Sequence, residues 1–188
     1  IKAAMDSLVI RNNVFWSNDE DITMLRVCQL VVEHNTFYDN QHTLTNVLLA
    51  GSVCFVSNTV SEASRCIVNY PSGKSRMNRN NFLHYNKNVT LFANVSPEDV
   101  DMRYNYWDTQ STEDIEALIL DKHDAPLLGE IFYEGFLPEC DTNAPISPPF
   151  AVKQQFVNGS WLVSWEDIPE RDLDHYVVFY GDFNHYKF

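Results

Sequence analysis

The segment Leu8-Val9-Ile10-Arg11-Asn12-Asn13-Val14-Phe15 decides the fold, because the motif that closes it returns at near-regular intervals along the chain. The motif is an Asn followed, two residues later, by a large apolar side chain. Its copies are Asn13-Val14-Phe15, Asn35-Thr36-Phe37, Asn58-Thr59-Val60, Asn80-Asn81-Phe82 and Asn105-Tyr106-Trp107, at spacings of 22, 23, 22 and 25 residues. Self-similarity at a period of about 20 to 50 residues is typical of repeat architectures such as solenoids.

Each repeat predicts two or three strands and no helix. An alternating run such as Leu30-Val31-Val32-Glu33 or Val53-Cys54-Phe55-Val56 precedes the Asn, and this period of two indicates a strand. A second short apolar run follows a polar turn, at residues 21–25, 46–49, 66–68 and 90–92. We therefore predict an all-β chain whose repeats stack as the coils of a parallel β-helix solenoid.

The recurring Asn has a physical role at the end of a strand. A tight bend turns backbone N–H and C=O groups inward, away from water, and an Asn side chain can serve both kinds of group. Asn also tolerates the left-handed conformation that such bends often require. With coils about 4.8 Å apart, we expect a structural Asn ladder of Asn13, Asn35, Asn58, Asn80 and Asn105.

A leucine-rich-repeat recognition protein is the alternative, since its template also carries an Asn at a similar period. Met5, Leu8, Ile10, Asn13 and Phe15 fit that template. Against it, the apolar positions hold mainly Val, Ile, Phe and Met, and the second half of each repeat is β-branched and rich in turn residues. The β-helix is the favoured interpretation.

The end of the solenoid has its own signals. Residues 111–114, Ser-Thr-Glu-Asp, followed by Ile115, Leu118 and Ile119, predict a short capping helix of about two to three turns, and residues 127–133 predict a closing strand. The run Asn105-Tyr106-Trp107-Asp108-Thr109 resembles the terminal coil of secreted right-handed β-helix proteins of the pectate-lyase-like superfamily, with Asp108 where those proteins commonly have Gly. The resemblance covers residues 1–138 and implies a right-handed, secreted, extracellular solenoid.

A change of composition marks a second region. Residues 139–149 hold Pro145, Pro148 and Pro149 and predict a Pro-rich linker. Residues 150–188 resemble the N-terminal strands of a fibronectin-III-like β-sandwich, with residues 161–165 and 176–181 as its B and C strands. Such a sandwich needs about 100 residues, so we expect an incomplete domain here and further domains of the same chain.

Composition excludes several functions. A net charge of -13 argues against binding nucleic acid, which needs clustered Lys and Arg. The sequence contains no run of about 18 apolar residues, so it predicts no membrane-spanning helix. The cysteines, Cys28, Cys54, Cys66 and Cys140, lack zinc-site spacing, and the sequence leaves their disulfide state open.

Two candidate carbohydrate-binding sets remain, and both rest on side-chain chemistry. The basic residues Arg65, Lys74, Arg76 and Arg79 are local exceptions in an acidic chain and could pair with carboxylates or sulfates of an acidic glycan. The aromatic residues Trp16, Tyr38 and Tyr85 lie near the ladder position in three coils and could form a surface for sugar rings. Ordinary ion pairing and core packing are the competing interpretations.

Other candidates are weaker. Residues 19–21, Asp-Glu-Asp, could hold Ca²⁺, although no cofactor is evident, and Asp121, His123 and Asp124 suggest a turn. His34 and His84 are expected to be structural. Three sequons, at Asn88, Asn94 and Asn158, are candidates for N-glycosylation of a secreted glycoprotein.

The resulting prediction is a fragment of a secreted or cell-surface modular protein, acting as a structural rod or a glycan-binding β-helix whose partners are polysaccharides or other surface components. The alternative implied by the resemblance is the C-terminal half of a polysaccharide lyase or glycoside hydrolase. No catalytic residue is assigned. An enzyme should place carboxylates or Lys and Arg side chains on successive coils of one face.

Overall fold

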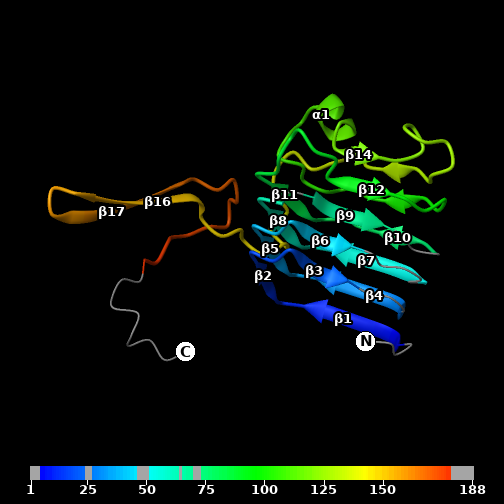
Figure 1. The fold of residues 1–188 in the computed structure, drawn as a ribbon, viewed down its shortest axis with the longest axis horizontal. Helices are drawn as coiled ribbons and strands as arrows, with labels where there is room; N and C mark the ends of the chain where they lie inside the picture. Colours follow the sequence, from blue (N-terminus) through cyan, green and yellow to red (C-terminus); the bar gives the residue numbers. More distant parts are fainter. Residues whose placement is uncertain (1–4, 24–26, 46–50, 64, 70–72, 179–188) are drawn as a thin grey trace.

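Residues 5–23, 27–45, 51–63, 65–69 and 73–178 are described by a computed structural model of the chain. They form a parallel β-solenoid from which a two-stranded hairpin projects to one side (Figure 1). In the described part of the chain no helix is long and apolar enough to cross a membrane.

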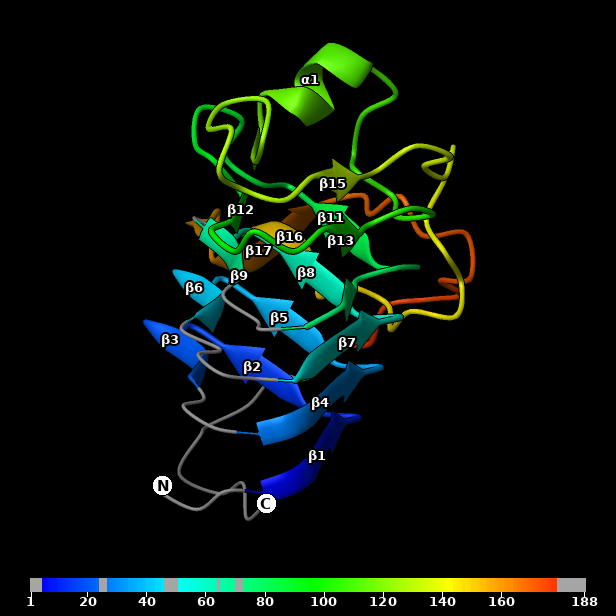
Figure 2. The ribbon, with the colours of Figure 1, turned by 90° about the vertical axis from the view of Figure 1, so that its right-hand side faces the viewer.

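Three parallel sheets make the sides of the solenoid (Figure 2). Sheet A contains β1 (Met5–Arg11), β4 (Val27–Glu33), β7 (Ser52–Val56), β10 (Ser75–Arg76), β13 (Val100–Asp101) and β15 (Ile131–Phe132). Sheet B contains β2 (Val14–Trp16), β5 (Thr36–Tyr38), β8 (Thr59–Ser61) and β11 (Asn81–Leu83). Sheet C contains β3 (Glu20–Thr23), β6 (His42–Thr45), β9 (Arg65–Asn69), β12 (Phe92–Asn94) and β14 (Ile119–Leu120).

The predicted all-β solenoid is confirmed. Each strand of the three sheets pairs in parallel with the strand one coil away, as in the register Val14↔Thr36, and no helix interrupts the described part of the first four coils. A leucine-rich repeat would need a helix or 3₁₀ segment in each repeat, so that alternative does not describe this chain. In the second coil the described sheet C strand is His42–Thr45, and the predicted apolar run at residues 46–49 lies outside the described residues.

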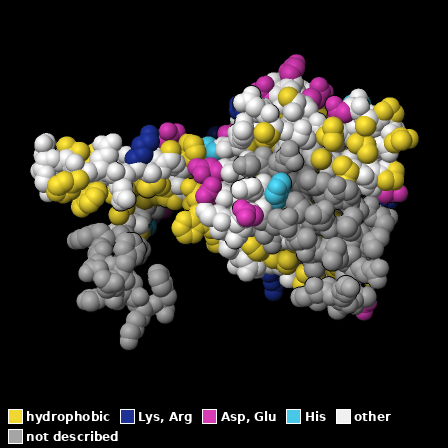
Figure 3. All heavy atoms as spheres, viewed as in Figure 1, with side chains coloured by type: hydrophobic (Ala, Val, Ile, Leu, Met, Phe, Trp, Pro, Cys, Tyr) yellow, Lys and Arg dark blue, Asp and Glu magenta, His cyan; other side chains and the backbone are white. Residues whose placement is uncertain are grey.

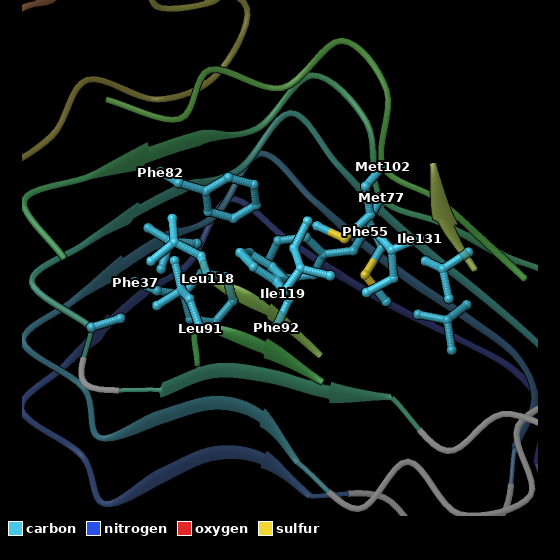
Figure 4. Packing of buried hydrophobic residues seen from close by; sticks show 14 of the residues in the cluster. Phe37, Phe55, Met77, Phe82, Leu91, Phe92, Met102, Leu118, Ile119 and Ile131 are labelled. Carbon is cyan, nitrogen blue, oxygen red and sulfur yellow. The ribbon is translucent and has the colours of Figure 1, made fainter. Parts of the chain in front are cut away.

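The core of the solenoid is aromatic and aliphatic. Phe15 stacks on Phe37 with ring centroids 4.8 Å apart, and Phe37 lies 5.7 Å from Phe55. Farther along, Phe82 and Phe92 pack against the fully buried Trp107. Figure 4 shows Phe37, Phe55, Phe82 and Phe92 among the inward side chains that meet between the sheets. Alternation in each strand sends the intervening residues to the outer faces.

The Asn ladder sits at the bend between sheets A and B. The Asn58 side-chain carbonyl accepts from the backbone N–H of Asn35 at 2.9 Å, and Asn80 does the same for the N–H of Asn58 at 2.9 Å. The side-chain amide of Asn58 donates to the carbonyls of Val32 and Val56, both at 3.0 Å. Equivalent bonds join Asn13 to Asn35 and Asn80 to Asn105. The side chains thus satisfy buried main-chain groups.

The left-handed residue of the bend is the one before each Asn. Positive φ angles of 51° to 61° occur at Asn12, His34, Ser57, Arg79 and Tyr104. The Asn side chain therefore supplies hydrogen bonds, while its predecessor makes the turn. Each coil has a second left-handed bend after sheet B, at Ser17, Asp39, Glu62, His84 and Asp108, with φ of 51° to 55°.

The last coil closes with short elements. Helix α1 spans Thr112–Glu116, shorter than predicted, and the Ser111 side chain caps it by accepting from the N–H of Asp114 at 3.1 Å. Ile119 belongs to β14 instead of the helix, and the closing strand β15 covers only Ile131–Phe132.

The C-terminal hairpin consists of β16 (Phe150–Val157) and β17 (Ser160–Glu166), paired antiparallel. Asn158 and Gly159 make its turn with φ of 51° and 82°, as expected for a two-residue turn. Residues 176–178 are not in a strand, and 179–181 lie outside the described residues, so the predicted C strand is not seen.

Candidate functional site

A segment that composition marks as a linker lies along the outer face of sheet B. The segment, residues 139–149, is called here the strap. The Asn81 side chain accepts a hydrogen bond from the backbone N–H of Asp141 at 2.8 Å and donates one to the backbone carbonyl of Asp141 at 3.1 Å. The Thr59 hydroxyl donates to the backbone carbonyl of Pro145. Arg79 pairs with Asp141 at 3.2 Å. The strap therefore covers β8 and β11.

Beyond the strap, two aromatic side chains stand on the outer face of sheet B. Trp16 and Tyr38 are aligned across neighbouring coils, and the same row continues to Ser61 and Leu83. Trp16 is 66% exposed and Tyr38 is half-buried, whereas Ser61 and Leu83 are buried. We call Trp16 and Tyr38 the aromatic shelf.

Tyr85 does not belong to this shelf. It is buried, and its hydroxyl donates to the carbonyl of Trp107. Burial and nearby negative charge raise the pKa of the Tyr85 phenol well above its usual value. The offset from the ladder Asn explains the difference, because Trp16 and Tyr38 follow their Asn by three residues and Tyr85 by five. In its coil, Leu83 takes the outward position.

A polar column borders the shelf at the second bend. This corner column consists of Ser17, Asp39, Glu62, His84 and Asp108, one residue from each successive coil. Ser17 donates to Asp39 at 2.5 Å, and the N–H of His84 donates to Asp108 at 3.1 Å. The left-handed backbone at each position turns these side chains out of the core.

Glu62 is the centre of the column. The side chain of Tyr38 and the backbone of Ala151, the second residue of β16, are close to the Glu62 carboxylate, and both act to lower its pKa. Burial raises the pKa of Glu62, and the charge of Asp39 adds to this, while nearby His84 acts in the opposite direction. The pKa of Tyr38 is raised as well, first by burial and then by Glu62.

Two buried polar atoms beside Glu62 lack a hydrogen-bond partner among the described residues. They are the hydroxyl oxygen of Ser61 and Nε2 of His84. Ser61 is 1% exposed and lies in the outward row next to Tyr38. His84 stacks on Phe150, with ring centroids 4.0 Å apart, where β16 leaves the solenoid. In Figure 3 acidic and histidine side chains lie at this junction. Unsatisfied buried polar atoms are uncommon, so they draw attention to this place.

The predicted basic set does not form one patch. Arg65 belongs to β9 of sheet C, its side chain lying outside the described ones, and Arg76 belongs to β10 of sheet A with Lys74 just before it. Arg79 occupies the first bend and is paired with Asp141. Arg76 contacts the sulfur of Cys54 at 3.5 Å.

A concave region of about 490 Å³ lies near α1 and β15, and Asp121 forms part of its wall. Asp121 accepts from the N–H groups of His123 and Ile131, both at 2.8 Å, and its own N–H donates to Asp124 at 3.2 Å. These bonds give the Asp121 cluster a turn-forming role. Across the described residues no group of three His, Cys, Asp or Glu side chains is arranged to hold a metal ion.

The remaining candidates have varied surroundings. Asn94 is buried, and its amide donates to the carbonyls of Glu98 and Gly129, so a glycan cannot be attached there in the folded chain. Asn88 and Asn158 are exposed in turns. Cys28, Cys54 and Cys140 are free thiols, and the Cys66 side chain is outside the described ones. His34 lies at the first bend, and Asp19 is exposed.

The corner column was missed by sequence reasoning, although a signal exists. Its members follow the ladder Asn by four residues in the first four coils and by three in the last. The shared offset places them at one bend, but their chemical variety hides the repeat. Comparisons with protein-family models, curated proteins and solved structures gave no match for this chain.

Proposed function

We propose that this chain is the carbohydrate-binding solenoid of a secreted or cell-surface modular protein, with the aromatic shelf as its binding surface. The observation that carries the proposal is the alignment of Trp16 and Tyr38 on neighbouring coils beside the acceptor groups of Asp39 and Glu62. Flat aromatic side chains offer apolar area with a polar edge, which suits the faces and hydroxyl groups of sugar rings.

The hairpin supports the modular part of this proposal. Trp161, Leu162 and Val163 of β17 are exposed, although a two-stranded ribbon of this kind is marginally stable alone. We propose that β16 and β17 are the first two strands of a fibronectin-III-like module that spaces the solenoid from other parts of the protein.

Affinity electrophoresis in gels containing neutral, acidic or amino-sugar polysaccharides tests the binding function. Trp16→Ala should weaken retardation by at least about tenfold, or ~1.4 kcal/mol. Trp161→Ala is the matched control, because Trp161 is 69% exposed and Trp16 66%, yet Trp161 lies on the hairpin. Failure of every glycan to retard the native chain would refute the proposal.

A glycoside hydrolase is the second candidate, and one observation favours it over a lyase. Asp39 and Glu62 stand on successive coils, and the raised pKa of Glu62 suits a proton donor. The lyase considered above would use Lys or Arg as its base, and the described corner column contains neither. Reducing ends released from a bound polysaccharide, and lost in Glu62→Gln, would establish hydrolysis.

A further inference from the structure

Two carboxylates stand among the hydrogen-bonding groups beside the aromatic shelf. Asp39 and Glu62 carry carboxylate oxygens on adjacent coils. Nε2 of His84 also lacks a hydrogen-bond partner among the described residues, and it accepts a hydrogen bond when the ring proton is on Nδ1. The unpartnered Ser61 hydroxyl, buried in the same row as Tyr38, can donate or accept, so the two carboxylates are what favour a ligand that brings hydrogen-bond donors.

The charges at the shelf are acidic. Asp39, Glu62 and Asp108 belong to the corner column, and His84 is the other titratable member. Three arginines of the solenoid are held by acids elsewhere: Arg79 by Asp141, Arg103 by Asp101 and Arg11 by Glu33. A ligand carrying carboxylates or sulfates would therefore meet like charge at the shelf.

From this geometry we propose that the aromatic shelf binds amino sugars bearing a free ammonium group, with Trp16 and Tyr38 against the ring and Asp39 and Glu62 holding the cation. An ammonium has three donors and no acceptor, which complements the acceptors of the column. An exposed aromatic face also attracts a cation directly. The inference rests on the proposed carbohydrate-binding function and specifies its ligand.

The proposal predicts an order of affinity among sugars of one size. A glucosamine tetramer should bind at least tenfold tighter than the N-acetylglucosamine tetramer, because acetylation removes the charge. A glucose tetramer should resemble the acetylated form, and a galacturonate tetramer should bind weakest. Titration calorimetry at pH about 6, where aliphatic amines are protonated, measures all four.

Matched variants separate site binding from general attraction to an acidic protein. Glu62→Gln and Asp39→Asn should each reduce the glucosamine preference about threefold to tenfold, with little change for the glucose tetramer. Glu166→Gln removes an exposed charge on the hairpin and should leave all affinities unchanged. Circular dichroism of each variant verifies that the fold is retained.

Each outcome decides a different point. Equal binding of the acetylated and free amino sugars, or equal loss in Glu62→Gln and Glu166→Gln, overturns the amino-sugar inference while leaving carbohydrate binding intact. Binding of glucose and glucosamine tetramers that both depend on Trp16, with the expected preference, supports it. The absence of binding to any tetramer overturns the proposed function and the inference together.

Discussion

Replacing Asn58 by Ala should destabilise the solenoid more than any exposed ladder substitution. The Asn58 side chain is fully buried, accepts two hydrogen bonds from Asn35 and donates to Val32, Val56 and Asn80. Its loss removes this partner from one buried N–H and two carbonyls. A buried polar group without a partner costs about 1–3 kcal/mol, and the carbonyls lose less because each has a second lone pair. We therefore expect Asn58→Ala to lower the free energy of unfolding by about 3 kcal/mol.

Urea unfolding followed by circular dichroism measures this loss. With an m-value of about 2–3 kcal/mol/M, a loss of about 3 kcal/mol lowers the midpoint by about 1 M. Asn13→Ala is the control, since Asn13 is exposed and, among the described residues, its side chain donates only to the carbonyl of Arg11 at 2.9 Å and to the Asn35 side chain at 3.2 Å. The control should lose less than about 1 kcal/mol. Equal midpoints for the two variants would refute the role assigned to the ladder.

Three other predictions concern stability and reactivity. Gly73→Ala should lower the urea midpoint, because an added Cβ would lie 1.8 Å from a backbone oxygen of the neighbouring coil; an unchanged midpoint would contradict this close approach. Hydrogen bonds from Arg103 lower the pKa of Asp101 to about 2, so its contribution to stability is present above about pH 4 and lost as the pH falls toward 2. Asp101→Asn should therefore flatten this acid dependence in pH-dependent unfolding, and an unaltered slope would argue against it. Burial raises the pKa of the Cys140 thiol to about 12, so maleimide at pH about 7.5 should label exposed Cys28 and leave Cys140 unlabelled until urea is added, whereas early labelling of Cys140 would place it outside the core.

The sequence predicted those structural features that require one particular type of residue. The ladder Asn is such a case, because few side chains both donate and accept at a buried bend, and its period therefore reveals the coil. The left-handed residue of the first bend was expected at the ladder Asn but is its predecessor, and residues such as Ser57, Glu62 and Arg79 have no marked preference for positive φ. Their conformation follows from the stacked backbone and not from the side chain.

The candidate site was predicted in part. Equal offsets from the ladder place Trp16 and Tyr38 together, whereas Tyr85 has a different offset and turns inward. The position of the strap could not be predicted, because its Pro-rich composition indicates only a linker. Composition does not reveal its contacts with Asn81 and Thr59, which lie 60 and 86 residues earlier in the sequence. The stacking of Phe150 on His84 is likewise a contact between residues far apart in the sequence.

The strap also has a consequence for the order of events during synthesis. Asn81 and Thr59 leave the ribosome 60 and 86 residues before the groups that later bond to them. At about 5–20 residues per second, the shorter interval lasts about 3 to 12 seconds. During that interval the outer face of β8 and β11 is not yet covered by the strap. Completion of the solenoid is therefore timed by a segment outside the repeats.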